Sequence, residues 1–301
     1  MFKRIVSCII SLLLIGALNT PCAISAKTLY ETNTDIAKGV ETLKSAGLSD
    51  KQINAMPKNS ILESANLKVV SSNHKYYKFT EVNQELITPI STLNSSSSEQ
   101  NSVEEISKEE FNTSNPVLTR TSVNQSVTVS YLQVSLVVLQ SAANKNEFSF
   151  KGSGWWKALP SSRSMDAIGV GISSNLIIQR QSYFSSIQYD ENRTNRKTRS
   201  TFNPYYIGAT GAGEYWKLPS DGPRTFCFDI MLNVSFRASA AAPSSSLQNF
   251  FAVASYAHQL STWAVVPSFS IGSSGAGLSL SPTQVNKFDR PVNCYSDFNN
   301  Q

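Results

Sequence analysis

The chain has 301 residues, of which 26 are basic, 21 are acidic and 41% are hydrophobic. This length allows one large domain or two domains of modest size. The basic excess is small and lacks the concentrated positive charge of nucleic-acid-binding proteins, so DNA and RNA are excluded as expected partners. A mildly basic protein suits an anionic cell-wall polymer or an acidic membrane surface.

The first 26 residues have the pattern of a secretory signal peptide. Lys3 and Arg4 precede an apolar run from Ile5 to Leu18, and small residues offer a cleavage site after Ala26. The run has the length of a signal-peptide core and is too short for a transmembrane helix. We therefore expect an exported, extracellular protein, either released or retained at the cell envelope by non-covalent contacts.

Residues 27–90 are predicted to form a small, mainly helical N-terminal unit. Apolar side chains recur there at helical spacing, at Ile36, Val40 and Leu43. Gly47 is placed to end this helix, and Ser49 is placed to cap a second, short helix that closes at Pro57. The aromatic residues between positions 75 and 79 favour a strand.

Residues 91–121 are predicted to be a Ser-rich linker. The run from Ser95 to Ser98 opens a polar, acidic segment that extends to about Asn115. Such a composition buries too little apolar surface to offset its conformational entropy. We expect this linker to be mobile and sensitive to proteases.

Residues 122–301 are predicted to form an all-β domain. Short apolar or alternating runs are separated there by Gly, Pro, Ser and Asn, with almost no helical periodicity, which favours an antiparallel β-sandwich or barrel. Gly208–Gly213 is interpreted as a flexible hairpin. The predicted strands cover residues 127–139, 148–150, 167–172, 183–189, 226–236, 250–256, 263–271 and 278–280.

Two cysteines, Cys227 and Cys294, remain once the predicted signal peptide is removed. In an oxidising compartment such a pair predicts a single disulfide, which would tie the C-terminal tail to a central strand. Two free thiols are the alternative interpretation.

No catalytic, metal or cofactor site is predicted. His258 is the one histidine of the β-domain, so a Ser–His–Asp arrangement would have to include it, and a structural role is the default expectation. The His and Cys spacings of metal sites are absent. A glycosidase needs only two carboxylates, and the sequence offers six candidates without indicating which of them face a cleft: Asp166, Asp190, Glu191, Glu214, Asp221 and Asp229.

Two features suggest binding. Trp155 and Trp156 are adjacent, so on a strand one of the two rings must point away from the core, where it could stack on a sugar. A predicted hairpin tip carries four cations within seven residues, which could contact an anionic polymer: Arg193, Arg196, Lys197 and Arg199.

Three segments resemble uncharacterised secreted proteins of Gram-positive spore-forming bacteria: Gly47–Pro57, Trp155–Pro160 and Tyr256–Gln259. The resemblance implies export and a two-part layout, and it brings no activity. Our interpretation is a non-enzymatic β-domain protein that binds the cell envelope or an extracellular polymer, with an anionic wall polymer, a carbohydrate or a membrane surface as its partner. The alternatives are a membrane-active or pore-forming protein, for which Ser-rich alternating strands are typical, and an extracellular hydrolase.

Overall fold

The computed structural model describes residues 26–84, 102–115, 117–122, 125–193, 195–222, 226–242, 247–259 and 291–300. The predicted strands at 263–271 and 278–280 and nearly all of the predicted signal peptide lie outside these ranges. The described chain is mainly β, as predicted, with a few short helices near its N-terminal end. Among the described residues, no helix combines the length and the apolar character needed to cross a membrane.

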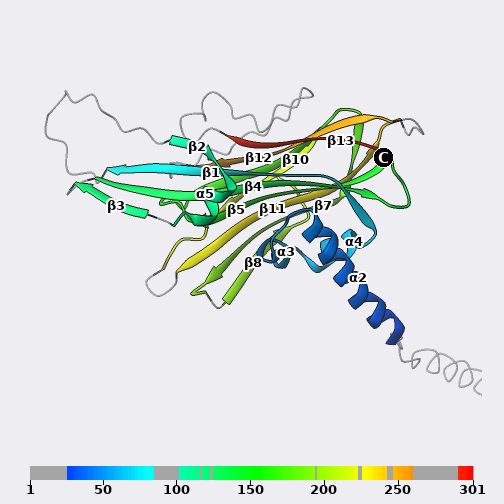
Figure 1. The fold of residues 1–301 in the computed structure, drawn as a ribbon, viewed down its shortest axis with the longest axis horizontal. Coiled ribbons are helices and arrows are strands. Elements are labelled where there is room, and N and C mark those ends of the chain that lie inside the picture. The colour runs from blue at the N-terminus through cyan, green and yellow to red at the C-terminus, as the bar shows by residue number, and fades with distance from the viewer. Residues whose placement is uncertain are drawn as a thin grey trace, which may run out of the picture.

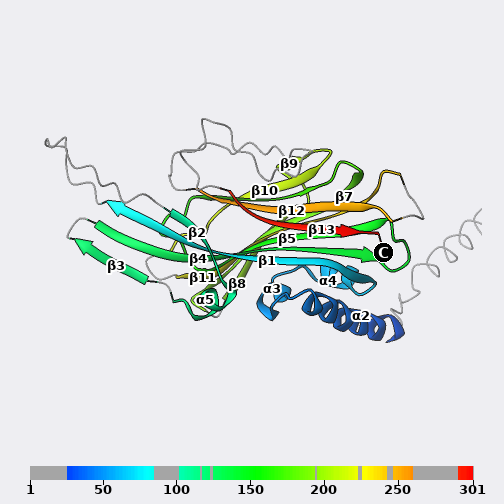
Figure 2. The same cartoon turned by 45° about the horizontal axis from the view of Figure 1, so that its top comes forward.

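The strands form two antiparallel sheets that face each other as a β-sandwich (Figures 1 and 2). The large sheet has the order β2-β1-β4-β5-β11-β7-β8, with β3 added beside β4. Its strands are β1 (Leu67–Gln84), β2 (Ser102–Ile106), β3 (Val117–Ser122), β4 (Gln125–Ser141), β5 (Glu147–Ala158), β7 (Leu176–Glu191), β8 (Asn195–Thr201) and β11 (Cys227–Ala240). The small sheet has the order β13-β12-β6-β10-β9 and consists of β6 (Met165–Ile172), β9 (Tyr206–Ile207), β10 (Gly211–Lys217), β12 (Asn249–His258) and β13 (Val292–Asn299).

The main core lies between the two sheets. Alternate side chains of β4, β5 and β11 point into it and meet those of β6 and β12, as the two-residue period of a strand requires. Aromatic residues fill one part of this core, where the rings of Phe148, Phe250 and Phe298 lie 5.2 to 5.6 Å apart. Burial of these large apolar side chains is the main force that holds the sheets together.

The helices α2 (Ala26–Ser45), α3 (Asp50–Asn54) and α4 (Lys58–Ser64) form a third layer on the outer face of the large sheet (Figure 2). The predicted ends are confirmed. Gly47 follows α2 with a φ of 80°, a left-handed conformation that glycine adopts without steric cost. Ser49 caps α3 in a reciprocal capping box with Gln52. We call residues 26–66 the helical unit.

Residues 102–115, which the sequence assigned to the linker, form β2 and the helix α5 (Lys108–Thr113). β2 pairs with β1, and Ser107 caps α5 so that Phe111 is buried against the large sheet. The strand β1, which the sequence assigned to the N-terminal unit, pairs with β4 along almost its whole length. Residues 85–101 lie outside the described ranges, so the linker there remains a prediction.

Candidate functional site

The four predicted cations lie on the hairpin formed by β7 and β8, at one edge of the large sheet. Asn192 and Arg193 make the turn with φ values of 53° and 64°. Arg196, Lys197 and Arg199 lie on β8 itself, beyond the tip, because the register pairs Asn195 with Glu191. We call residues 190–199 the basic hairpin.

Two of these cations have acidic partners on the other strand of the hairpin. Arg196 lies 3.3 Å from Asp190, and Lys197 lies 3.7 Å from Glu191. All four side chains are partly exposed, so solvent screens these ion pairs and each contributes little to stability. The basic hairpin therefore keeps an excess of positive charge.

The other two cations lie against aromatic rings. The guanidinium of Arg193 is 4.9 Å from the ring centre of Phe228, and that of Arg199 is 5.9 Å from the ring centre of Trp216. Nη2 of Arg199 also donates a hydrogen bond of 2.7 Å to the carbonyl of Lys217. These contacts hold Arg199 at the junction of β8 and β10.

A hollow of about 270 Å³ opens at this junction. Arg199 and Lys217, which are 18 residues apart in the chain, both line this hollow. Tyr189 and Glu191 form another part of its wall. The sequence indicated the basic hairpin but not this hollow. Lys217 and residues 218–220 lie beside the hairpin only because the small sheet packs against the large sheet. The two cations outnumber the one carboxylate, Glu191, so the partly open hollow has a positive balance of charge that suits an anionic group.

The tryptophan pair lies elsewhere, on β5. The two rings are on opposite faces of the large sheet, as expected for adjacent strand residues. Trp156 is fully buried in the core, so its proposed role in sugar stacking is corrected to a packing role. Trp155 faces outward and is half-buried, with Phe111 at 5.8 Å and Nζ of Lys51 at 5.6 Å from its ring centre. These contacts leave Trp155 only partly available for stacking on a sugar.

The sequence did not predict the buried polar cluster that joins the two sheets. The carboxylate of Asp166 on β6 lies 2.7 Å from Nδ1 of His258 on the neighbouring strand β12. Asp166 also accepts hydrogen bonds from the hydroxyl of Tyr256 and, at 2.9 Å, from the indole of Trp156 on the opposite sheet. These four side chains are completely buried.

A loop packs against the same cluster. Glu81 on β1 accepts hydrogen bonds from the amides of Ser161 and Ser162 at 3.2 and 3.1 Å, and its carboxylate lies 3.9 Å from Nε2 of His258. Although histidine, carboxylates and serines gather here, full burial of His258 and Asp166 keeps substrate away from them. The described geometry therefore supports the structural role for His258 that was the default expectation.

Each of the other five candidate carboxylates has a structural partner. Asp190 and Glu191 pair within the basic hairpin, and Asp229 lies 2.8 Å from Lys51 of α3. Asp221 accepts from the amide of Cys227, while Glu214 accepts from two backbone amides, and burial raises its pKa. Within the described ranges, no three His, Cys, Asp or Glu side chains gather as metal ligands would.

The predicted disulfide is not formed. Cys227 and Cys294 are free, buried thiols. Cys227 opens β11 in the large sheet and Cys294 lies within β13 of the small sheet, so the sandwich holds them in separate layers. Burial raises the pKa of Cys294 to about 12 and raises that of Cys227 as well, which keeps both sulfurs in the unreactive thiol form.

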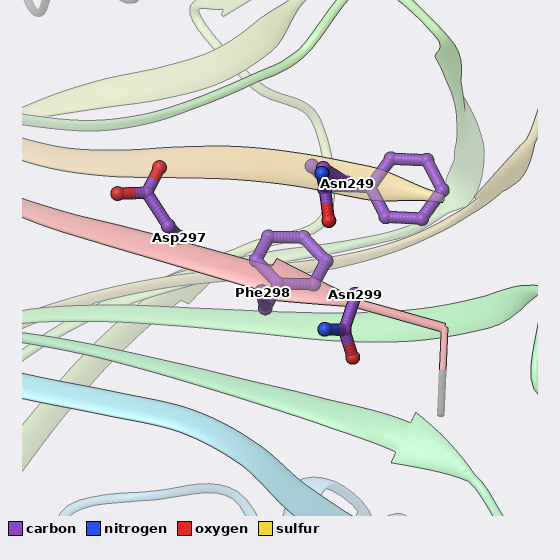
Figure 3. Close-up of a pocket in the computed structure, with 5 residues that line it drawn as sticks. Asn249, Asp297, Phe298 and Asn299 are labelled. Carbon is purple, nitrogen blue, oxygen red and sulfur yellow. The ribbon is translucent and has the colours of Figure 1, made fainter. Parts of the chain in front are cut away.

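A second hollow of about 400 Å³ lies where β12 and β13 pair, near the end of the described chain (Figure 3). Figure 3 shows Asp297, Phe298 and Asn299 in succession on β13, with Asn249 beside them on β12. Its polar groups are one carboxylate and two amides, so this hollow lacks the positive charge of the hollow beside the basic hairpin.

No family model and no curated protein match the chain. Four chains of solved structures match. One of them is described as "pH-induced modulation of Streptococcus parasanguinis adhesion by Fap1 fimbriae"; it is 11% identical, and the match covers 55% of this chain and 80% of that chain. The TM-score of 0.26 is too low to support any argument on fold or function.

Proposed function

We propose that the chain is an exported, non-enzymatic β-sandwich protein that binds an anionic polymer of the cell envelope through the basic hairpin and the hollow beside it. The observation that supports this function best is the position of Arg199 and Lys217 on one partly open hollow, next to the exposed cations of β8. A polymer with regularly spaced phosphates could place one group in the hollow and others along the hairpin.

Protection of the sheet edge offers a different explanation of the same charges. Edge strands commonly carry Lys and Arg because these side chains block pairing with other chains. Edge protection requires charge on β8, but it does not require a hollow with two cations at the junction with β10. The two explanations therefore differ in what they predict for the binding of polyanions.

The test measures binding of residues 27–301, the expected exported form, to purified Gram-positive cell walls and to soluble poly(glycerol phosphate) over a range of salt concentrations. We expect affinity to fall with salt, and the slope to decrease by roughly one for each phosphate-binding cation that is removed. Replacement of Arg193, Arg196, Lys197 and Arg199 by Ser should abolish the salt-dependent binding.

A matched control removes four exposed cations far from the basic hairpin: Lys38, Lys58, Arg180 and Arg237, each replaced by Ser. This variant has the same net charge as the hairpin variant and should keep binding. The double variant Asp190→Asn/Glu191→Gln should bind more tightly, because it releases Arg196 and Lys197 from their acidic partners. If both Ser variants lost the same binding affinity, net charge alone would explain the binding and the proposed site would be refuted.

The membrane-active alternative is tested in parallel. Anionic vesicles loaded with a fluorescent dye are mixed with the protein at the concentrations that saturate the cell walls. Rapid release of the dye would replace the proposed function with the membrane-active one. Binding without release, together with loss of binding in the hairpin variant, supports polymer binding.

A further inference from the structure

The helical unit covers a surface of unusual composition on the large sheet. On β5, Ser149, Lys151 and Ser153 alternate with core residues, so they face outward, yet all three are buried. The same face carries further buried polar side chains from β4, β7 and β11: Ser135, Ser186, Gln188 and Asn233. The outer face of a sheet that is permanently covered is normally apolar.

Polar contacts across this surface link α3, α4 and the residue after α3 to three different strands. Nζ of Lys151 donates to Oγ and to the carbonyl of Ser60 on α4, at 2.5 and 3.3 Å. Nε2 of Gln52 on α3 donates to Oγ of Ser135 at 3.3 Å. Gln188 donates to the carbonyl of Ala55, just after α3.

The apolar contribution comes mostly from the helical unit itself. Of the seven buried residues in this cluster, five belong to residues 43–61 (Leu43, Ala46, Leu48, Ile53 and Ile61), and only Val137 and Leu139 belong to the sheet. Separation of the helical unit would expose hydroxyl, amide and ammonium groups of the sheet, which water solvates well. The apolar side chains exposed with them on the sheet would be few: Leu67, Val69, Val137 and Leu139. The sandwich core, between the two sheets, would be unchanged.

We propose that the helical unit is a displaceable cap on the hydrophilic outer face of the large sheet, one that opens without unfolding of the sandwich and opens more readily as the pH falls. The occupant of this docking surface is thus the chain's own residues 26–66. The helical unit covers the outer face of the large sheet, whereas the small sheet packs on its inner face. The inference does not depend on the proposed function.

The pH dependence follows from two basic groups whose charged forms are less stable under the closed cap than in water. Burial lowers the pKa of Lys151 to about 8; Arg237 lowers it further, and Glu63 opposes the shift. Burial also lowers the pKa of His74, with a smaller contribution from Lys108, while the carbonyl of Ala46 acts in the opposite direction. Protonation of either group therefore favours the open state, in which water can surround it.

The hydrogen bonds around His74 favour its neutral form in the closed state. Its Nε2 lies 3.0 Å from the carbonyl of Ala46, which can only accept, so this nitrogen carries the proton. Oγ of Ser135 accepts from Gln52 and Gln133 and therefore donates to Nδ1 of His74 at 2.8 Å. A proton on Nδ1 would point toward the hydroxyl hydrogen of Ser135, and this clash of two donors would break the network.

Hydrogen exchange of residues 27–301, converted to opening equilibrium constants, tests the proposal. We expect amides of α3 and α4 to open at least about tenfold more often than those of central β5 and β11. The opening constant of α3 and α4 should rise about tenfold from pH 9 to pH 7, because the lysine titrates near 8 when closed and near 10.4 when open. The constants for β5 should not change in parallel.

Two variants separate Lys151 from general charge effects. Lys151→Met should make the opening of α3 and α4 rarer and remove most of its change between pH 9 and pH 7. Lys58→Met, which removes an exposed lysine from α4, should behave like the unmodified protein. A single opening constant shared by α4 and β5 would overturn the proposal, and so would a pH-independent opening. The comparison of α4 with β5 in the unmodified protein decides the matter even if the Lys151 variant does not fold.

Discussion

The imidazole Nδ1 of His258 lies 2.7 Å from Oδ1 of Asp166, and the residues face each other across β6 and β12 in the interior of the sandwich. Asp166 receives further hydrogen bonds from Tyr256 and from Trp156 of the other sheet. Two of the three segments that carry the sequence resemblance, Trp155–Pro160 and Tyr256–Gln259, thus meet at one carboxylate. We interpret the cluster as a buried hydrogen-bond network that links the two sheets.

Removal of the charge on Asp166 should therefore weaken the whole sandwich. We expect Asp166→Asn to lower the free energy of unfolding by about 2–4 kcal/mol, because an amide cannot accept from three buried donors at once. Urea unfolding measures the loss. The control is Asp297→Asn, which replaces an exposed carboxylate on β13. It should change the free energy of unfolding by less than about 0.5 kcal/mol. Equal unfolding midpoints in the two variants would contradict the role of Asp166.

The strands with strong apolar alternation could be predicted from the sequence. β4, β5, β6, β7, β11 and β12 overlap the predicted strands, because the apolar residues that face the core recur at alternate positions along most of their length. The ends of α2 and α3 were also predictable, since Gly47 and Ser49 act locally.

The strands that were not predicted are held mainly by hydrogen bonds to neighbouring strands, and their own sequences lack a strong apolar pattern. The hairpin predicted at Gly208–Gly213 is present between β9 and β10, but the rest of β10 was missed, and Gly211 and Gly213 also pair with Gly171 and Gly169 of β6 inside the small sheet. In β13 the buried positions alternate, but the polar residues Ser296 and Asp297 weaken the pattern. The cation-lined hollow could not be predicted, because Arg199 and Lys217 come together only in the folded sheets.

The two cysteines should remain thiols in the folded protein. We expect a thiol reagent in native buffer near pH 8 to leave Cys294 unlabelled and to label Cys227, which borders the hollow beside the basic hairpin, only slowly. Both should be labelled in guanidinium chloride. Burial and the raised pKa values of both sulfurs are the reason for their protection in native buffer. A reducing agent should leave the melting temperature unchanged. A mass showing the loss of two hydrogens in the non-reduced protein would instead reveal a disulfide.

Gly39 should be required for the closed form of the helical unit. A Cβ atom at this position of α2 would lie 1.9 Å from the carbonyl oxygen of Ile61 on α4, so the two helices could not keep their contact. We expect Gly39→Ala to cost about 1–3 kcal/mol and to increase hydrogen exchange in α2 and α4 more than in β5. Ala37→Ser, an exposed change on the same helix, is the control and should leave exchange unaltered.

Limited proteolysis should cut residues 91–101, the part of the predicted linker that precedes β2. Cleavage within residues 102–115 should be much slower, because β2 pairs with β1 and Phe111 is buried. The two pieces should then elute together in size-exclusion chromatography and separate only in denaturant, since β1 lies between β2 and β4. Separation in native buffer would mean that the N-terminal piece is an independent domain.

The stability of the protein should depend on pH through Lys151. Its pKa is about 8 in the folded chain and near 10.4 in an unfolded one, so between these values the unfolded state binds more protons. The contribution of Lys151 to the free energy of unfolding therefore rises as the pH increases from about 8 to about 10.4 and is constant below that window. Lys151→Met should flatten this rise.

The same variant should also be more stable near neutral pH. A methionine of similar length fills the space below α4 without a charge to desolvate, although the carbonyl of Ser60 loses its partner. We expect a net gain of about 1–3 kcal/mol at pH 7 and a smaller difference at pH 10, both measured by urea unfolding. Lys217→Met, an exposed lysine on β10, provides the matched comparison and should give no gain at either pH. A destabilised Lys151→Met protein at pH 7 would show that the bond to Ser60 outweighs the cost of burying the ammonium group.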